Sequence, residues 1–205
     1  MSDGQQKLSR MDRKKIDMRN RIIDTTVRLI QAKGFDGTTM EQIARETDIA
    51  KKTLYNYYPE KEAIISDYIK RTFETKNPLR LSHLKTLGDT RARVIYILNN
   101  LIDGVRAQKE IFEKYLVYIM KQVVSFDRHE GGDSGVGALI KAVIGLGLEE
   151  GDIRGDLPPA AAEDFFIFVF IEAAKQFYAD QENFKQDEVI EKCADLFING
   201  TKVRK

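Results

Sequence analysis

Apolar residues recur every three or four positions along almost the whole chain, which is the spacing of helices with one buried face. No segment alternates apolar and polar residues as a half-buried strand does. We expect helices over 14–33, 38–47, 51–57, 59–75, 89–108, 110–126, 136–150, 158–180 and 187–200. The pattern therefore predicts an all-α protein, with a small N-terminal unit of three helices and a larger C-terminal helical bundle.

Local signals set several of these boundaries. Gly34 follows the cationic end of the first helix and suits the residue after a helix C-terminus. Thr38 and Glu41 have the spacing of a capping box at the start of the second helix. Pro59 suits the start of the fourth helix, and 77–89 is expected to be a connector containing at most a short helix.

Composition narrows the classes of protein. The chain has 205 residues, of which 42% are hydrophobic, enough for a substantial core. Its net charge is only +1, but cations exceed acids in residues 1–76 and acids exceed cations in the rest. A polyanionic partner would therefore meet the N-terminal part. The most apolar run, 165–171, is too short to cross a membrane, so we expect a cytoplasmic protein that does not bind membranes.

Residues 39–58 have the pattern of a helix–turn–helix, with two short helices joined by a short turn. Leu54 and Tyr58, four residues apart, are expected to pack on the first of these helices. The other side of the second helix carries a run of hydrogen-bond donors: Lys51, Lys52, Thr53, Tyr55, Asn56 and Tyr57. Such donors suit DNA phosphates and base edges. The alternative is a polar helix that only covers the end of a bundle.

The stretch "GFDGTTMEQIARETDIAKKTLYNYYPEKEAI" resembles the TetR/AcrR family of transcriptional regulators. The matching features are Gly34, Phe35, Thr38, Thr39, Ile43, Ala44, Thr53, Tyr55, Tyr57, Tyr58, Lys61 and Glu62. The resemblance implies that Thr39 opens the second helix and touches phosphate. It also implies that Thr53, Tyr55 and Tyr57 bind phosphates or bases, and that Lys61 binds phosphate.

Three positions depart from the family's usual pattern. Asp48 stands where the turn usually has glycine, and aspartate tolerates the left-handed conformation better than most residues. Ala50 stands where a serine or threonine usually caps the recognition helix, which removes a cap worth about 1 kcal/mol. Lys52 stands where the family frequently has glycine. Its positive charge is expected to compensate for the contact that is lost at Ala50.

These observations divide the chain into four parts. Residues 1–15 form a flexible basic arm that enters the minor groove or is simply a solvated tail. Residues 16–58 form the DNA-binding domain, 59–76 a connecting helix, and 77–205 a domain for effector binding and dimerisation.

The stretch 151–177 also resembles the TetR family, in which the last two helices pair with their copies in a second subunit. We expect a homodimer because a palindromic site needs two recognition helices. The alternative is a fully interior helix of a monomer. The residues expected at the dimer interface are Val169, Ala173, Phe177, Val189, Cys193, Leu196 and Phe197.

Aromatic residues are frequent in the predicted bundle, and most belong to its core. Some are expected to line a cavity for a small, mainly apolar organic effector. The candidates are Tyr96, Phe112, Tyr115, Tyr118, Phe166 and Phe170.

No catalytic residues, metal ligands or cofactor site are predicted, because no nucleophile–base pair or ligand cluster is visible. The leading hypothesis is a ligand-responsive regulator, most simply a repressor, that binds double-stranded operator DNA as a homodimer. Two alternatives are an architectural DNA-binding protein without effector control and an all-α enzyme. Against the architectural protein, the C-terminal bundle is larger than dimerisation alone requires.

Overall fold

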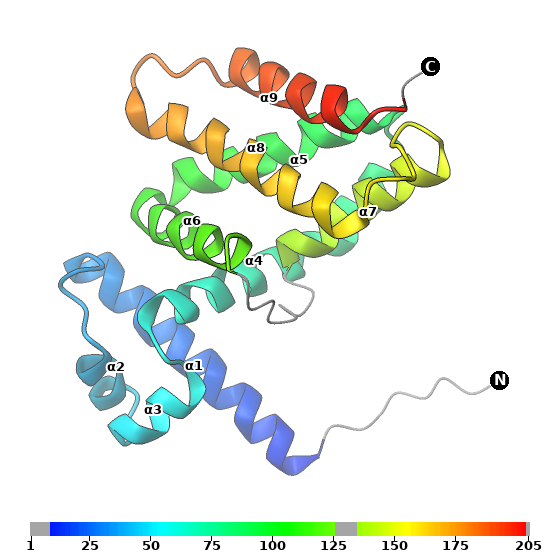
Figure 1. Cartoon of the computed structure of the whole chain (residues 1–205). Coiled ribbons are helices and arrows are strands. Elements are labelled where there is room, and N and C mark those ends of the chain that lie inside the picture. Colours follow the sequence, from blue (N-terminus) through cyan, green and yellow to red (C-terminus); the bar gives the residue numbers. More distant parts are fainter. Residues whose placement is uncertain (1–8, 126–134, 204–205) are drawn as a thin grey trace. The chain divides into compact units, whose positions relative to one another are not determined.

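The computed structural model describes residues 9–125 and 135–203, and within these ranges every regular element is a helix (Figure 1). The all-α prediction is therefore confirmed for the described residues. The helices are α1 (Arg10–Lys33), α2 (Met40–Glu46), α3 (Lys51–Tyr57), α4 (Lys61–Leu84), α5 (Thr90–Ala107), α6 (Lys109–Val123), α7 (Gly135–Glu149), α8 (Pro159–Ala179) and α9 (Gln186–Thr201). The chain divides into two compact units, with the boundary between Tyr68 and Ile69.

Helix α1 begins earlier than predicted. Ser9 caps it by accepting a hydrogen bond from the backbone N–H of Asp12, and the Asp12 side chain reaches back to the Ser9 N–H. This capping box satisfies two free donors and lets the helix start at Arg10. The expected flexible arm is thus wrong for residues 10–15, which are helical, and its residues 1–8 lie outside the described chain.

The first unit is held together by apolar side chains from all of its helices. Ile22 of α1, Ile43 of α2, Leu54 of α3 and Ile64 of α4 are completely buried. Gly34 ends α1 with φ of 77°, the positive value that glycine adopts without strain. This small core fixes α3 by its inner face and leaves its outer face to solvent.

Helix α4 continues through the segment expected to be a connector. It contains Pro78 and ends only at Leu84. A proline removes one helical hydrogen bond, but Phe73 and Leu84 on either side of it are buried, so packing preserves the helix.

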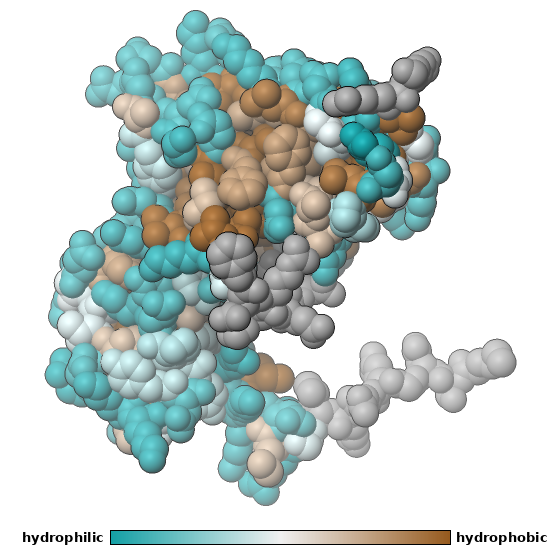
Figure 2. Space-filling view, viewed as in Figure 1, coloured by the Kyte–Doolittle hydropathy of each residue, from teal (hydrophilic) through white to brown (hydrophobic). Residues whose placement is uncertain are grey.

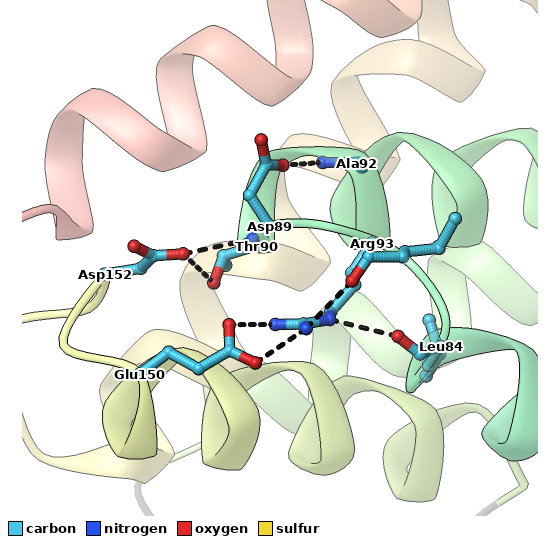
Figure 3. Close-up of polar contacts among 8 residues, drawn as sticks. Leu84, Asp89, Thr90, Ala92, Arg93, Glu150 and Asp152 are labelled. Atoms are coloured by element: carbon cyan, nitrogen blue, oxygen red, sulfur yellow. Dashed lines mark hydrogen bonds and ion pairs between the residues drawn. The ribbon is translucent and has the colours of Figure 1, made fainter.

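In the second unit, α5 packs against α6, α7, α8 and α9, and α8 lies beside α9 (Figure 1). Arg93 of α5 joins three segments at one end of this bundle (Figure 3). Its buried guanidinium forms two hydrogen bonds with Glu150, at 2.5 and 2.7 Å, and donates to the carbonyls of Leu84 and Leu87. Asp152 accepts bonds from the backbone and hydroxyl of Thr90 nearby. These bonds fix the C-terminal ends of α4 and α7 to the start of α5.

Candidate nucleic-acid interface and bundle surface

The turn between α2 and α3 is short because Asp48 takes a left-handed conformation and its neighbours bond back to α2. Asp48 has φ of 54°, as expected for the residue that replaces glycine here. The backbone N–H of Ile49 donates to the Ala44 carbonyl at 3.0 Å, and the buried Thr47 hydroxyl donates to the Ile43 carbonyl at 2.7 Å. The turn is therefore held by α2 itself.

Helix α3 has one buried face and one exposed face. Leu54 and Tyr58 are buried, as predicted. The donor-bearing side chains divide by position: Lys51, Lys52, Thr53, Tyr55 and Asn56 are exposed, and Tyr57 is half-buried. The helix thus presents ammonium, hydroxyl and amide donors together to solvent. As expected for Ala50, no side chain caps its N-terminus.

Tyr58 has a structural role that explains one of the three closely spaced tyrosines. Its hydroxyl donates to Asp67 at 2.7 Å and accepts from Arg19 at 3.4 Å, and Arg19 also pairs with Asp67 at 3.3 Å. Burial raises the pKa of Tyr58, so this hydroxyl stays protonated and remains a donor. The network ties the end of α3 to α1 and α4.

Thr39, and not Thr38, is the N-cap of α2, and its hydroxyl oxygen accepts from the Gln42 N–H at 3.1 Å. The expected capping box of Thr38 and Glu41 is wrong because the Thr38 hydroxyl is turned inward to the Gly34 carbonyl. Glu41 instead forms an ion pair with Lys51 of α3. Ten residues of separation give no helical signal for this pair, so sequence reasoning missed it.

Lys61 lies at the start of α4, but its ammonium faces the protein. It donates to the carbonyl of Phe35 at 2.5 Å and to that of Thr38, and it lies 4.0 Å from the centre of the Phe35 ring. The group predicted to bind phosphate thus stabilises the turn that precedes α2. Among the eight predicted DNA-binding residues, Lys61 is the one whose ammonium donates hydrogen bonds to backbone carbonyls.

Comparison with known proteins identifies this geometry. Residues 22–68 match the family described as "Bacterial regulatory proteins, tetR family", a range that spans the second half of α1, all of α2 and α3, and the start of α4. The match places this part of the chain with the TetR family of regulatory proteins.

Relatives and solved structures agree with this match. The negative transcriptional regulator IcaR of the icaADBC biofilm operon from Staphylococcus aureus (strain Newman) is 37% identical over 60 residues, which are 29% of this chain and 32% of IcaR. The HTH-type transcriptional regulator YuxN of Bacillus subtilis (strain 168) is 30% identical over 87 residues, 40% of this chain and 30% of YuxN. The matched part of the chain thus spans about a third of these curated relatives. They are regulators, not enzymes.

The fold similarity extends over both units of the chain. The Thermus thermophilus repressor FadR, solved in complex with lauroyl-CoA, has a TM-score of 0.69 at 23% identity, covering 91% of this chain and 96% of FadR. At this identity the likeness establishes the fold. The predicted helix–turn–helix domain with a C-terminal helical domain is therefore confirmed.

The residues predicted to line an effector cavity are mostly core. Phe112, Tyr115, Phe166 and Phe170 are buried, and Phe166 packs edge-on against Phe197 at 5.5 Å. Only Tyr96 and Tyr118 are half-buried. A groove of about 340 Å³ lies instead between α6 and α8, and none of the six lines it. Its lining residues are Glu113, Leu116, Val117, Met120, Lys121, Ile171, Lys175 and Tyr178.

The residues predicted for the dimer interface divide in a similar way. Six are buried within their own bundle: Val169, Ala173, Phe177, Val189, Cys193 and Phe197. They face inward because α8 and α9 pack on α5 and on each other. These six side chains expose at most 9% of their surface, so they offer a partner subunit little contact area. Leu196 is 60% exposed, and Phe168 of α8, which sequence reasoning left out, is 42% exposed.

None of the helices described is both long enough and apolar enough to cross a membrane. The described residues also contain no group of three or more histidine, cysteine or acidic side chains arranged to hold a metal ion.

Proposed function

We propose that this chain is a ligand-responsive transcriptional repressor that binds palindromic operator DNA as a cytoplasmic homodimer. The observation that carries the proposal is the exposed face of α3, where Lys51, Lys52, Thr53, Tyr55 and Asn56 gather on a helix fixed by its buried side. A helix held in this way enters the major groove as a rigid element, with its donors near phosphates and base edges.

The proposed roles follow from position and chemistry. Lys51, Lys52, Thr53, Tyr55 and Tyr57 bind phosphate, and Thr39 does so from the start of α2. Asn56 reads a base, because an amide pairs with adenine through two hydrogen bonds. Lys61 supports the turn before α2, and its contact with phosphate is secondary.

The proposed homodimer uses the outer sides of α8 and α9. Phe168 and Leu196 are exposed there, and Figure 2 shows apolar surface over α8 in the second unit. Large exposed apolar surface on a folded protein favours a protein–protein contact. Repression is supported by the name of IcaR as a negative regulator, and a small effector by the lauroyl-CoA complex of FadR.

The test is a mobility-shift titration on DNA from the chain's own promoter region. Replacing Lys52, Thr53 and Asn56 together by alanine should weaken binding at least about 100-fold, since each contact contributes on the order of 1 kcal/mol. Removing the Lys52 ammonium should also reduce the slope of log affinity against log salt by about 1.

The matched control replaces Lys76 and Lys85, two exposed lysines of the second unit, by alanine. This control removes more positive charge but should leave operator binding close to wild type. Equal losses in both variants would mean that binding follows bulk charge, and the α3 assignment would then be wrong. If operator binding persists and no apolar compound changes it, the architectural alternative is favoured.

A further inference from the structure

The inner face of α4 in the second unit contains two polar residues where apolar ones would be expected. Phe73, Asn77, Arg80 and Leu84 follow one another at spacings of four, three and four, so they share one side of the helix. Phe73 and Leu84 are 3% and 0% exposed, and Asn77 is only 6% exposed. Asn77 and Arg80 thus occupy the middle of a buried stripe.

Asn77 is only partly satisfied. Its side-chain N–H donates to the Gly135 carbonyl at 2.7 Å, which fixes the orientation of the amide. Its Oδ1 is then directed away from this bond, is buried, and has no hydrogen-bond partner in the described part of the chain. Buried polar groups in folded proteins nearly always have a partner, so the free acceptor needs an explanation.

Arg80 has an unsatisfied group three residues later. Its Nε donates to Asn100 Oδ1 at 3.1 Å, and its guanidinium lies 4.6 Å from the centre of the Phe73 ring. Its Nη1 is buried and makes no hydrogen bond to any described residue. No carboxylate in the described ranges pairs with Arg80, and burial lowers the pKa of its guanidinium.

Arg93 of the same bundle is an arginine with a structural role, and its partners can be compared with those of Arg80. Its guanidinium is paired with the Glu150 carboxylate and with two backbone carbonyls. Among the described residues Arg80 has one amide partner and no counter-charge. The difference marks Arg80 as a cation held ready for an anion that the described residues do not provide.

We propose that Arg80 and Asn77 form the polar anchor of the effector site, and that the effector is an apolar organic acid whose carboxylate binds Arg80 Nη1. This inference rests on the proposed function and names the chemical class of its effector. The acceptor of Asn77 receives a donor of the same ligand, such as a hydroxyl near the carboxylate. The free N–H groups of Nη1 and the free acceptor of Asn77 suit a singly charged group that also carries a donor better than a phosphate, which carries up to about two charges.

The position on α4 gives such a ligand a route to the DNA-binding unit. Helix α4 is continuous from Lys61 to Leu84, and its first eight residues belong to the first unit. Pro78 lies between the two anchoring residues and removes a helical hydrogen bond there. Pairing Arg80 with a carboxylate would favour one conformation of α4 over another, which is the differential binding that control requires.

The experiment measures calorimetric binding of octanoate, octan-1-ol, octyl phosphate and 3-hydroxyoctanoate to the full chain. Octanoate should bind at least tenfold more tightly than octan-1-ol and than octyl phosphate, and 3-hydroxyoctanoate at least threefold more tightly than octanoate. Arg80→Met should abolish the preference for octanoate over octan-1-ol, and Asn77→Leu the preference for the hydroxy acid. The control Lys76→Met removes an exposed cation of the same helix and should change neither preference.

A second readout separates a binding role from a structural one. Arg80→Met removes a half-buried, unpaired charge, so its melting temperature without ligand should be no lower than that of the wild type. A clearly lower melting temperature with unchanged ligand preference would overturn the proposal, as would equal binding of octanoate and octan-1-ol by the wild type. Tighter binding of octyl phosphate would overturn the choice of a carboxylate. Operator binding without ligand, measured on the same samples, tests the proposed function separately.

Discussion

Lys61 shows how a single residue can differ from the role that its motif implies. Family resemblance predicts a phosphate contact, whereas its ammonium donates to the carbonyls of Phe35 and Thr38. We expect Lys61→Met to lower the free energy of unfolding by about 2 kcal/mol, because hydrogen bonds to charged groups contribute about 1.5–3 kcal/mol. Urea unfolding followed by circular dichroism measures this change.

The matched control for Lys61 is Lys52→Met, which removes an exposed ammonium of α3 and should leave unfolding unchanged while weakening DNA binding. The contrary pattern would be a Lys61→Met variant that unfolds like wild type but has lost its affinity for DNA. In that case the ammonium acts mainly on phosphate, as the motif alone predicts.

Glu41 places a negative charge at the proposed DNA-binding face. It pairs with Lys51, and this pairing raises the pKa of Lys51. Glu41→Gln should strengthen operator binding about three- to tenfold at low salt, because it frees Lys51 and removes repulsion from phosphate. The gain should fade as salt is raised. Glu46→Gln, at the other end of α2, is the control, and an equal gain there would indicate a general charge effect.

At the level of single residues, the sequence was informative where the local conformation depends on the residue itself and its near neighbours. The positive φ of Asp48, the missing cap at Ala50 and the burial of Leu54 and Tyr58 were all predictable. Contacts between residues distant in sequence were not predictable. The bonds of Lys61 and the unpaired atoms of Asn77 and Arg80 depend on tertiary packing, which leaves no periodic signal.

Helix α3 is short and uncapped, so its stability depends on the core beneath it. Ala50 already has the extended conformation of an N-cap, with φ of −63° and ψ of 143°, but no side-chain acceptor. Ala50→Ser should therefore raise the free energy of unfolding by about 1 kcal/mol. Thermal unfolding checks this, with Ala50→Val as a control that lacks an acceptor. No gain in the serine variant would mean that the N-terminus of α3 is already satisfied by solvent.

The limits of α1 and α4 show why helix ends were the weakest predictions. The sequence signal at Pro78 favours a break, and Pro78 does remove a hydrogen bond, but the buried residues around it hold α4 together. At α1 the signal was present and overlooked, since Ser9 and Asp12 have capping-box spacing with aspartate in place of glutamate. Propensity locates a helix, and packing or a cap determines where it ends.

At the scale of the molecule, the pattern predicted two units and their helices but not which side of each helix is covered. Helix α8 is apolar on more than one side and α9 carries an apolar stripe that includes Leu196, so sequence alone could not separate core from interface. The structure assigns Phe197 to the core and leaves Leu196, its neighbour, exposed. The chemistry of the proposed effector likewise comes from an unpaired atom in the bundle and not from any motif.

This separation gives a sharp test of the proposed homodimer. Leu196→Asp places a charge on the exposed side of α9, where it would be buried without a partner in a dimer. Light scattering should then show a shift from a dimer towards the 23.5 kDa monomer, with an unchanged helical spectrum and at least about tenfold weaker operator binding.

Leu79→Asp, at an 81% exposed position of α4, makes the same substitution away from the proposed interface and should leave the mass unchanged. Phe197→Asp should instead unfold the second unit, because Phe197 has no exposed surface in the single chain. If Leu196→Asp remains a dimer with full affinity for DNA, the two copies meet through another face.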